Sequence, residues 1–170
     1  LFPFYWMGVT SLQTNQEMYN PGAMPLVIEK GVTFDHYIQL ITETKFPSWF
    51  LNSTIVAVSV TLFSVIVSVL AAYSLTRLEF RGSSTLGIAI FITYLVPPTL
   101  LFIPLSRVVS FLGLTDTIWA LILTYPTFAI PFSTWLLMGY FRTIPKELEE
   151  CAMIDGATRL QALYRIVLPV

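Results

Sequence analysis

Three long stretches of this chain contain no Asp, Glu, Lys or Arg, and they limit the possible folds more than any other feature. They cover residues 46–76, 82–106 and 117–141, and they are 31, 25 and 25 residues long. A helix that spans a bilayer needs about 20 mostly apolar residues, because each residue advances it by about 1.5 Å. Each stretch is therefore long enough to cross a membrane with some tilt. The sequence predicts an all-α fold, a polytopic transmembrane helix bundle.

The overall composition supports this fold class and excludes several functions. Hydrophobic residues make up 55% of the chain and charged residues 11%, whereas ordinary soluble domains are about 25% charged. The net charge is −1, and no basic tract alternates with aromatic residues, so no nucleic acid partner is predicted. The single cysteine excludes an internal disulfide and a multi-cysteine metal site.

The apolar stretches place the expected spans at residues 50–76, 84–106 and 117–140. Residues 1–12 are also apolar, but they are too short to cross a bilayer and lack the basic start and cleavage site of a signal peptide. We interpret them as the end of a truncated first span. Residues 1–170 are thus expected to form a single transmembrane domain.

Basic residues are distributed unequally between the two sides of the predicted membrane. The basic loops of membrane proteins favour the cytoplasm. We therefore expect residues 141–169 to form a cytoplasmic loop and residues 13–48 to form an external segment. The side assigned to the cytoplasm carries six basic residues: Arg77, Arg81, Arg142, Lys146, Arg159 and Arg165. The other side carries three: Lys30, Lys45 and Arg107.

The external segment is polar and interrupted by turn-forming residues. Residues 20–22 (Asn-Pro-Gly) predict a turn, and Pro25 follows it. His36, the only histidine, is expected to have a hydrogen-bonded surface role rather than to act as a ligand or proton relay. Apolar residues at helical spacing predict a short amphipathic helix near the membrane surface: Phe34, Tyr37, Ile38 and Ile41.

Small residues and prolines predict how the spans pack. Ser64, Ser68 and Ala72 recur at every fourth position, and such a stripe of small side chains allows close contact between helices. Prolines in the two later spans free backbone groups, which neighbouring helices or water must then satisfy. We expect these two helices to be kinked and packed in a bundle. The prolines are Pro97, Pro98, Pro104, Pro126 and Pro131.

The charged segment near the end of the chain is typical of two short helices around a glycine. Pro145 suits the first helical position, where its missing N–H costs nothing. Glu147, Glu149 and Glu150 complement the positive end of this helix. Gly156 fits the left-handed position that ends such a helix.

A second helix is expected to begin at Thr158. Gln161 follows three residues later and completes a capping-box pattern. Four apolar residues of this helix fall at positions i, i+3, i+4 and i+7, which predicts one apolar face: Leu160, Leu163, Tyr164 and Val167.

This segment resembles the EAA loop of the permease subunits of binding-protein-dependent ABC importers. The family pattern is Glu-Ala-Ala, three residues, Gly, nine residues and then Ile-x-Leu-Pro. Cys151 is the one departure, and cysteine is also small and hydrophobic. The matching positions are Glu150, Cys151, Ala152, Gly156, Ile166, Leu168 and Pro169.

Other segments resemble the carbohydrate branch of that family, the maltose-type permeases. These segments are residues 73–77, 80–82, 112–117, 145–149 and 155–157. In the family the Leu-Pro pair leads into further spans, so the resemblance implies a chain truncated at both ends.

The resemblance implies a permease subunit that forms part of the pathway for a mono- or oligosaccharide. A coupling loop at residues 147–169 would dock on the ATPase subunit. Glu150 would be its charged contact to the ATPase, and Cys151 a small residue buried at that interface. Four further residues would shape the docking helix: Ala152 and Ala157 by allowing close approach, Gly156 by permitting the turn, and Asp155 by capping or holding it.

The implied partners are a dimer of ABC ATPase subunits, a second permease subunit and an extracytoplasmic solute-binding protein. The implied location is the lipid bilayer of a bacterial or archaeal cytoplasmic membrane, crossed several times. ATP and Mg²⁺ would bind to the ATPase subunit, because this chain has no Gly-x-x-x-x-Gly-Lys-Ser/Thr loop. No catalytic residue, cofactor site or metal site is expected in the chain itself.

Alternative functions differ in how far the sequence supports them. An ABC permease for a non-sugar solute would carry the same loop. A secondary transporter or channel is disfavoured because no ionisable side chain lies within a span. An intramembrane enzyme is disfavoured because no pair of Asp or Glu residues lies within a span. Tyr94, Tyr125 and Trp135 could stack on a sugar, but aromatic residues in spans more often pack, so no pathway residue is assigned.

Overall fold

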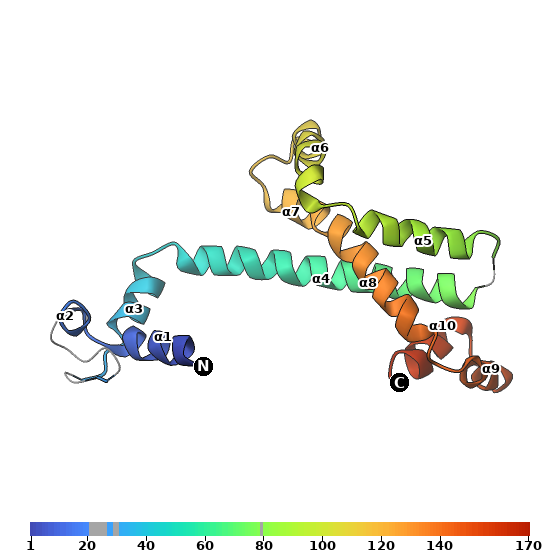
Figure 1. Cartoon of the computed structure of the whole chain (residues 1–170), viewed down its shortest axis with the longest axis horizontal. Helices are drawn as coiled ribbons and strands as arrows, with labels where there is room; N and C mark the ends of the chain where they lie inside the picture. Colours follow the sequence, from blue (N-terminus) through green and yellow to red (C-terminus); the bar gives the residue numbers. More distant parts are fainter. Residues whose placement is uncertain (21–26, 29–30, 79) are drawn as a thin grey trace. The chain divides into compact units, whose positions relative to one another are not determined.

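The computed structural model describes residues 1–20, 27–28, 31–78 and 80–170 (Figure 1). These residues form helices and connecting turns, with no strand among them. They divide into two compact units, Leu1–Ser53 and Thr54–Val170. The turn expected at Pro21 and Gly22, and Pro25 after it, lie outside the described residues.

The first unit contains three short helices and the start of a long one. The short helices are α1 (Phe2–Leu12), α2 (Asn15–Met18) and α3 (Asp35–Thr42). Helix α3 lies where an amphipathic helix was expected. His36 Nε2 lies 3.0 Å from the carbonyl oxygen of Gln13, and the Tyr37 hydroxyl donates to Ser11 Oγ at 2.7 Å. These two contacts join α3 to the end of α1.

Helix α4 (Phe46–Arg77) is 32 residues long and covers the whole span expected at residues 50–76. Ser68 Oγ donates a hydrogen bond to the carbonyl oxygen of Ile130 at 3.3 Å, which places the predicted stripe against α8 (Pro126–Phe141). One buried residue every fourth position marks this contact face: Val56, Val60, Ser64, Ser68 and Ala72. The small-residue stripe is therefore a helix contact, as the sequence predicts.

The stretch from 82 to 106 forms two helices rather than one. Helix α5 (Ser83–Tyr94) and helix α6 (Pro98–Phe111) are bent by 93° at the break between them, and α6 turns away from α5 in Figure 1. Pro98 has no N–H to donate to the carbonyl group of Tyr94, so the hydrogen-bond ladder of a helix is interrupted there. The break is much sharper than the kink that the prolines predict.

The last apolar stretch is nearly continuous. Helix α7 (Ile118–Thr124) and helix α8 are separated only by Tyr125, and together they make a candidate span, Ile118–Phe141, of 24 residues. Among the described residues, α4 and this segment are long and apolar enough to cross a membrane, and the bent α5–α6 pair is a third if it is one span.

Helix α8 also packs against α5, with side chains meeting at three levels. The Phe91 and Trp135 rings stack with centroids 5.0 Å apart, and the centroids of Tyr94 and Phe132 are 5.2 Å apart. At the third level, the side chain of Met138 lies against Gly87, where the absence of a side chain leaves room for it.

The main apolar cluster lies where the end of α4 meets the loop after α8. It contains Ala72, Tyr73, Met138, Phe141, Ile144, Leu163 and Val167. Its members come from α4, α8 and the last part of the chain, so the charged loop is packed onto the helix bundle.

Candidate coupling loop

The loop begins where α8 ends, and its first helix is α9 (Lys146–Ile154). Pro145 has φ −58° and ψ 132°, so it is the residue before the first helical one and not, as predicted, the first. Helix α9 thus begins one residue later than predicted. Proline has the same fixed φ in both places, and sequence alone does not determine ψ.

Gly156 ends α9 in the left-handed conformation that the sequence predicts, with φ +92°. Its N–H donates to the carbonyl of Met153 at 3.1 Å, and the N–H of Ala157 donates to the carbonyl of Ala152 at 2.9 Å. This pair of bonds is the Schellman pattern. Asp155 is the C-cap residue that directly precedes Gly156. Backbone hydrogen bonds therefore hold the turn.

Helix α10 (Arg159–Ala162) starts with the predicted capping box. Gln161 N–H donates to Thr158 Oγ1 at 3.3 Å, and Thr158 N–H donates to Gln161 Oε1 at 2.7 Å. These two bonds satisfy backbone donors that a helix start would otherwise leave without partners. The helix start is therefore determined locally, as expected.

The predicted apolar face of this second helix is wrong in part. Leu163 and Val167 are buried, but Leu160 is 63% exposed and Tyr164 is 51% exposed. After α10 the chain continues as a π-helix, η1 (Leu163–Val167), in which the N–H of residue 168 donates to the carbonyl of residue 163. The wider turn changes the periodicity, so a face drawn at 3.6 residues per turn does not persist.

Glu149 connects α9 to the end of α4. Its Oε1 lies 2.5 Å from Arg77 Nε, and its Oε2 accepts a hydrogen bond from the Tyr73 hydroxyl at 2.9 Å. The side chains of Arg77 and Glu149 are each 6% exposed. The carboxylate is thus paired inside the protein.

The same two residues of α4 reach the segments on either side of α9. Arg77 Nη2 donates to the carbonyl of Ile144 at 2.9 Å, in the turn that precedes α9. The Tyr73 hydroxyl also lies 3.4 Å from the carbonyl oxygen of Arg159, at the start of α10. The end of α4 therefore contacts the turn, α9 and α10 together.

Sequence reasoning missed this cluster, which we call the α4–α9 joint and define as Tyr73, Arg77 and Glu149. Glu149 was assigned only to the positive end of the helix. Tyr73 and Arg77 stand four positions apart and so share one face of α4, but nothing in the sequence pairs them with a residue of the later loop.

The opposite side of the loop is open to solvent in this chain. Leu148 is 44% exposed and Ile154 is 85% exposed. Cys151 is also exposed in this single chain, and its burial at an interface with the ATPase stays a prediction. The remaining predicted site residues divide into exposed ones, Glu150, Asp155, Gly156, Leu168 and Pro169, and half-buried ones, Ala152, Ala157 and Ile166.

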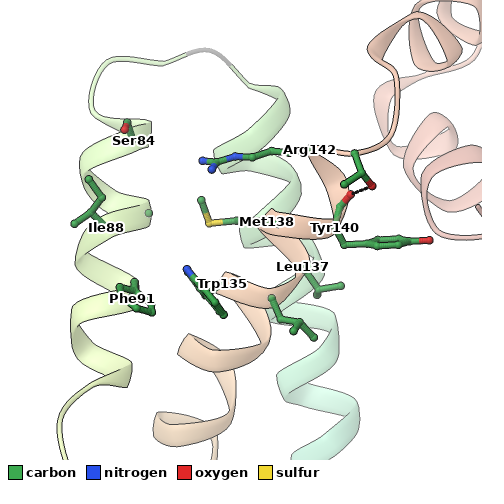
Figure 2. Close-up of a pocket in the computed structure, with 12 residues that line it drawn as sticks. Ser84, Ile88, Phe91, Trp135, Leu137, Met138, Tyr140 and Arg142 are labelled. Atoms are coloured by element: carbon green, nitrogen blue, oxygen red, sulfur yellow. Dashed lines mark hydrogen bonds between the residues drawn. The ribbon is translucent and has the colours of Figure 1, made fainter.

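A cavity of about 950 Å³ lies between α5 and α8, close to the start of the loop. Figure 2 shows Trp135, Met138 and Arg142 directed toward α5, whereas Leu137 and Tyr140 point away from it. Trp135, one of the aromatic residues considered for sugar stacking, is stacked on Phe91 here.

The other two aromatic residues line a second recess of about 490 Å³. Tyr94 and Tyr125 share it with the side chains of Val60, Phe128, Ala129 and Phe132. Within the part of the chain that the structure describes, no group of three or more His, Cys, Asp or Glu residues is arranged to hold a metal ion.

Comparison with known proteins identifies the family. Residues 64–170 match the family described as binding-protein-dependent transport system inner membrane component. The chain belongs to this family. Both α9 with its glycine turn and the α4–α9 joint lie inside the matched region of this permease chain.

Curated relatives match the permease chain over its whole length. It is 37% identical to the inner membrane ABC transporter permease protein YcjP of Escherichia coli, with 100% of this chain and 61% of the relative covered. It is also 37% identical to the trehalose/maltose transport system permease protein MalG of Thermococcus litoralis, over 100% of this chain and 60% of that protein. The chain thus spans about three fifths of the length of these relatives.

A solved structure is also similar. It is a bacterial ABC transporter involved in the import of the acidic polysaccharide alginate, with a TM-score of 0.82 and 26% sequence identity over 99% of this chain and 58% of the matched one. The all-helical transmembrane architecture predicted from the sequence is therefore confirmed.

Proposed function

We propose that this chain is part of the permease subunit of an ATP-driven ABC importer that carries a sugar across a bacterial or archaeal cytoplasmic membrane. Family membership supports the importer class. The names of related permeases support a carbohydrate as the solute: trehalose and maltose, maltodextrin, and diacetylchitobiose. The subunit would cross the membrane several times and form part of the translocation pathway.

The two-sided character of α9 is the observation that carries the coupling role. On one side, Glu149 is buried and paired with α4. On the other side, Glu150 and Cys151 are exposed together with the apolar side chain of Ile154. A helix that is fixed to the bundle on one face and presents mixed charged and apolar groups on the other is suited to receive a partner protein.

We infer that this partner is the ATPase subunit, and that the loop 147–169 transmits its motion to the spans. A pair of ATPase subunits would bind ATP and Mg²⁺ and hydrolyse the nucleotide. A second permease subunit would complete the pathway, and an extracytoplasmic solute-binding protein would deliver the sugar. This chain would contribute no catalytic group, in keeping with relatives that are transport permeases.

The test uses the full-length subunit, expressed with its partner permease and ATPase subunits and reconstituted with the solute-binding protein. ATPase co-purification and uptake of radiolabelled maltose, trehalose, maltotriose or diacetylchitobiose are measured. Uptake that depends on ATP is the expected result. Uptake without any ATPase subunit would favour a secondary transporter or channel and overturn the proposal. ATP-driven uptake of only a non-sugar solute would overturn the substrate class alone.

A further inference from the structure

We propose that the α4–α9 joint is a positioning device that makes α9 and the end of α4 move as one body when the ATPase displaces α9. The inference rests on the proposed function and adds three positioning residues to it: Tyr73, Arg77 and Glu149. None of them contacts solute or nucleotide in this assignment. They act through α9, whose exposed face is the one that meets the ATPase.

The joint contacts the chain before, within and after α9. Tyr73 and Arg77 lie one turn apart on α4, and their polar groups contact the carbonyl of Ile144, the carboxylate of Glu149 and the carbonyl of Arg159. These three groups precede α9, lie within it and follow it. A force applied to α9 therefore meets fixed points of α4 along the whole length of the segment.

The contacts of the joint are polar and directional. Apolar packing surrounds the joint through Phe141, Ile144 and Leu163, but apolar contacts are not directional and tolerate small shifts of one helix past another. The buried Glu149 carboxylate accepts a hydrogen bond from the Tyr73 hydroxyl and forms an ion pair with Arg77. A shift of α9 would break the hydrogen bond, whose geometry is directional, and would leave charges unpaired in a poorly solvated site. The joint therefore determines the register between α9 and α4.

Helix α4 connects the joint to α8. The buried stripe of α4 continues from Ala72 through Ser68, which donates a hydrogen bond to the backbone of α8 at Ile130. Packed helices transmit small displacements because their interfaces shift between discrete arrangements rather than deform continuously. Motion of α9 thus reaches α4 directly and the α4–α8 pair through the stripe.

The experiment measures the amount of solute transported per ATP hydrolysed in the reconstituted full-length complex, using the labelled sugar that the wild-type complex imports. Glu149→Gln keeps the shape of the side chain and removes its charge, and Tyr73→Phe removes only the hydroxyl. We expect both to lower the transport-to-hydrolysis ratio by about two- to thirty-fold, the range of coupling effects measured for residues that link sites. ATPase co-purification should persist.

A charge-exchange variant and a control complete the design. Arg77→Glu combined with Glu149→Arg restores an ion pair of opposite orientation and should recover part of the ratio that Arg77→Glu alone loses. Arg81→Gln removes a positive charge from an exposed residue just before α5 and should leave the ratio within two-fold of the wild type.

The outcomes separate the joint from the proposed function. If the single variants change only the amount of assembled complex while the ratio stays at the wild-type value, the joint is merely structural and the inference is wrong. If the wild-type complex itself shows no ATPase association or no ATP-driven uptake, the proposed function fails instead.

Discussion

The hydroxyl of Tyr73 donates a hydrogen bond of 2.9 Å to Glu149, a residue 76 positions later in the chain. This bond and the ion pair with Arg77 give the two neighbouring glutamates of α9 opposite environments. Glu149 is 4% exposed, whereas Glu150 lies on the open side of the helix. The difference leads to contrasting expectations for substitutions at two adjacent positions.

We expect Glu149→Ala to destabilise the subunit and Glu150→Ala to weaken ATPase binding. Removing one partner of a buried pair leaves the other charge uncompensated, at a cost of about 3–5 kcal/mol. An exposed residue with no such role changes folding stability by less than about 0.5 kcal/mol, but truncating a charge at a docked interface costs about 2–5 kcal/mol of binding. Thermal unfolding of the purified subunit and ATPase titration measure the two effects separately.

The matched control for this pair is Glu149→Gln, which retains the volume of the side chain and should lose less stability than Glu149→Ala. Equal loss of thermal stability in the Glu149→Ala and Glu150→Ala variants would contradict the assignment of inward and outward faces.

Gly156→Val should disrupt the turn between α9 and α10. At φ +92° a side chain is strained even though no atom lies within 4 Å of the position that a Cβ would occupy. The expected cost is about 1–3 kcal/mol of backbone strain, with misplacement of α9 and reduced ATP-driven uptake. Transport assays and the thermal stability of the complex provide the measurements.

Gly139→Ala serves as the comparison for that variant, because Gly139 lies within α8 and also has open space around it. Alanine is a better helix former than glycine by about 0.5–1 kcal/mol, so this variant should be neutral or slightly more stable. Loss of uptake in Gly139→Ala but not in Gly156→Val would show that the left-handed turn is not the critical feature.

The side chain of Met138 limits the size of the residue that position 87 can accommodate. A Cβ at this position would lie 2.6 Å from Met138 Cε, the end of a flexible side chain. Gly87→Ala should therefore cost little, because methionine can move and alanine favours the helix. Gly87→Leu should cost about 1–3 kcal/mol by overpacking, and Met138→Ala in the same chain should recover much of that loss. Unfolding in detergent tests the series, and failure of Met138→Ala to rescue would argue against close packing of α5 on α8.

The proposed topology also has a direct test. In a chain carrying Cys151→Ala, single cysteines introduced as Gln16→Cys and Ser83→Cys should react with an impermeant thiol reagent from opposite sides of the membrane. The basic residues that flank the spans are the reason for this expectation. Labelling of both positions from the same side would refute the predicted orientation.

Local features of this chain could be predicted from its sequence. Uncharged stretches gave the approximate limits of α4 and of the Ile118–Phe141 segment, because the bilayer requires about 20 apolar residues for each crossing. The left-handed turn at Gly156 and the capping box of Thr158 and Gln161 could also be predicted. Their backbone angles and hydrogen bonds depend only on neighbours within a few residues.

Which of the two glutamates of α9 is buried depends on the packing of the helices. Glu149 and Glu150 are adjacent and chemically identical, and only the packing of α9 against Tyr73 and Arg77 distinguishes them. The π-helical turn after α10 and the 93° break between α5 and α6 were likewise not fixed by local pattern. Pro98 marks where the break occurs, because it has no N–H to donate, but it does not set the angle of 93°. Nothing in the pattern of residues 163–167 marks the wider turn of η1. The packing of whole helices outweighs the weak conformational preferences of single residues.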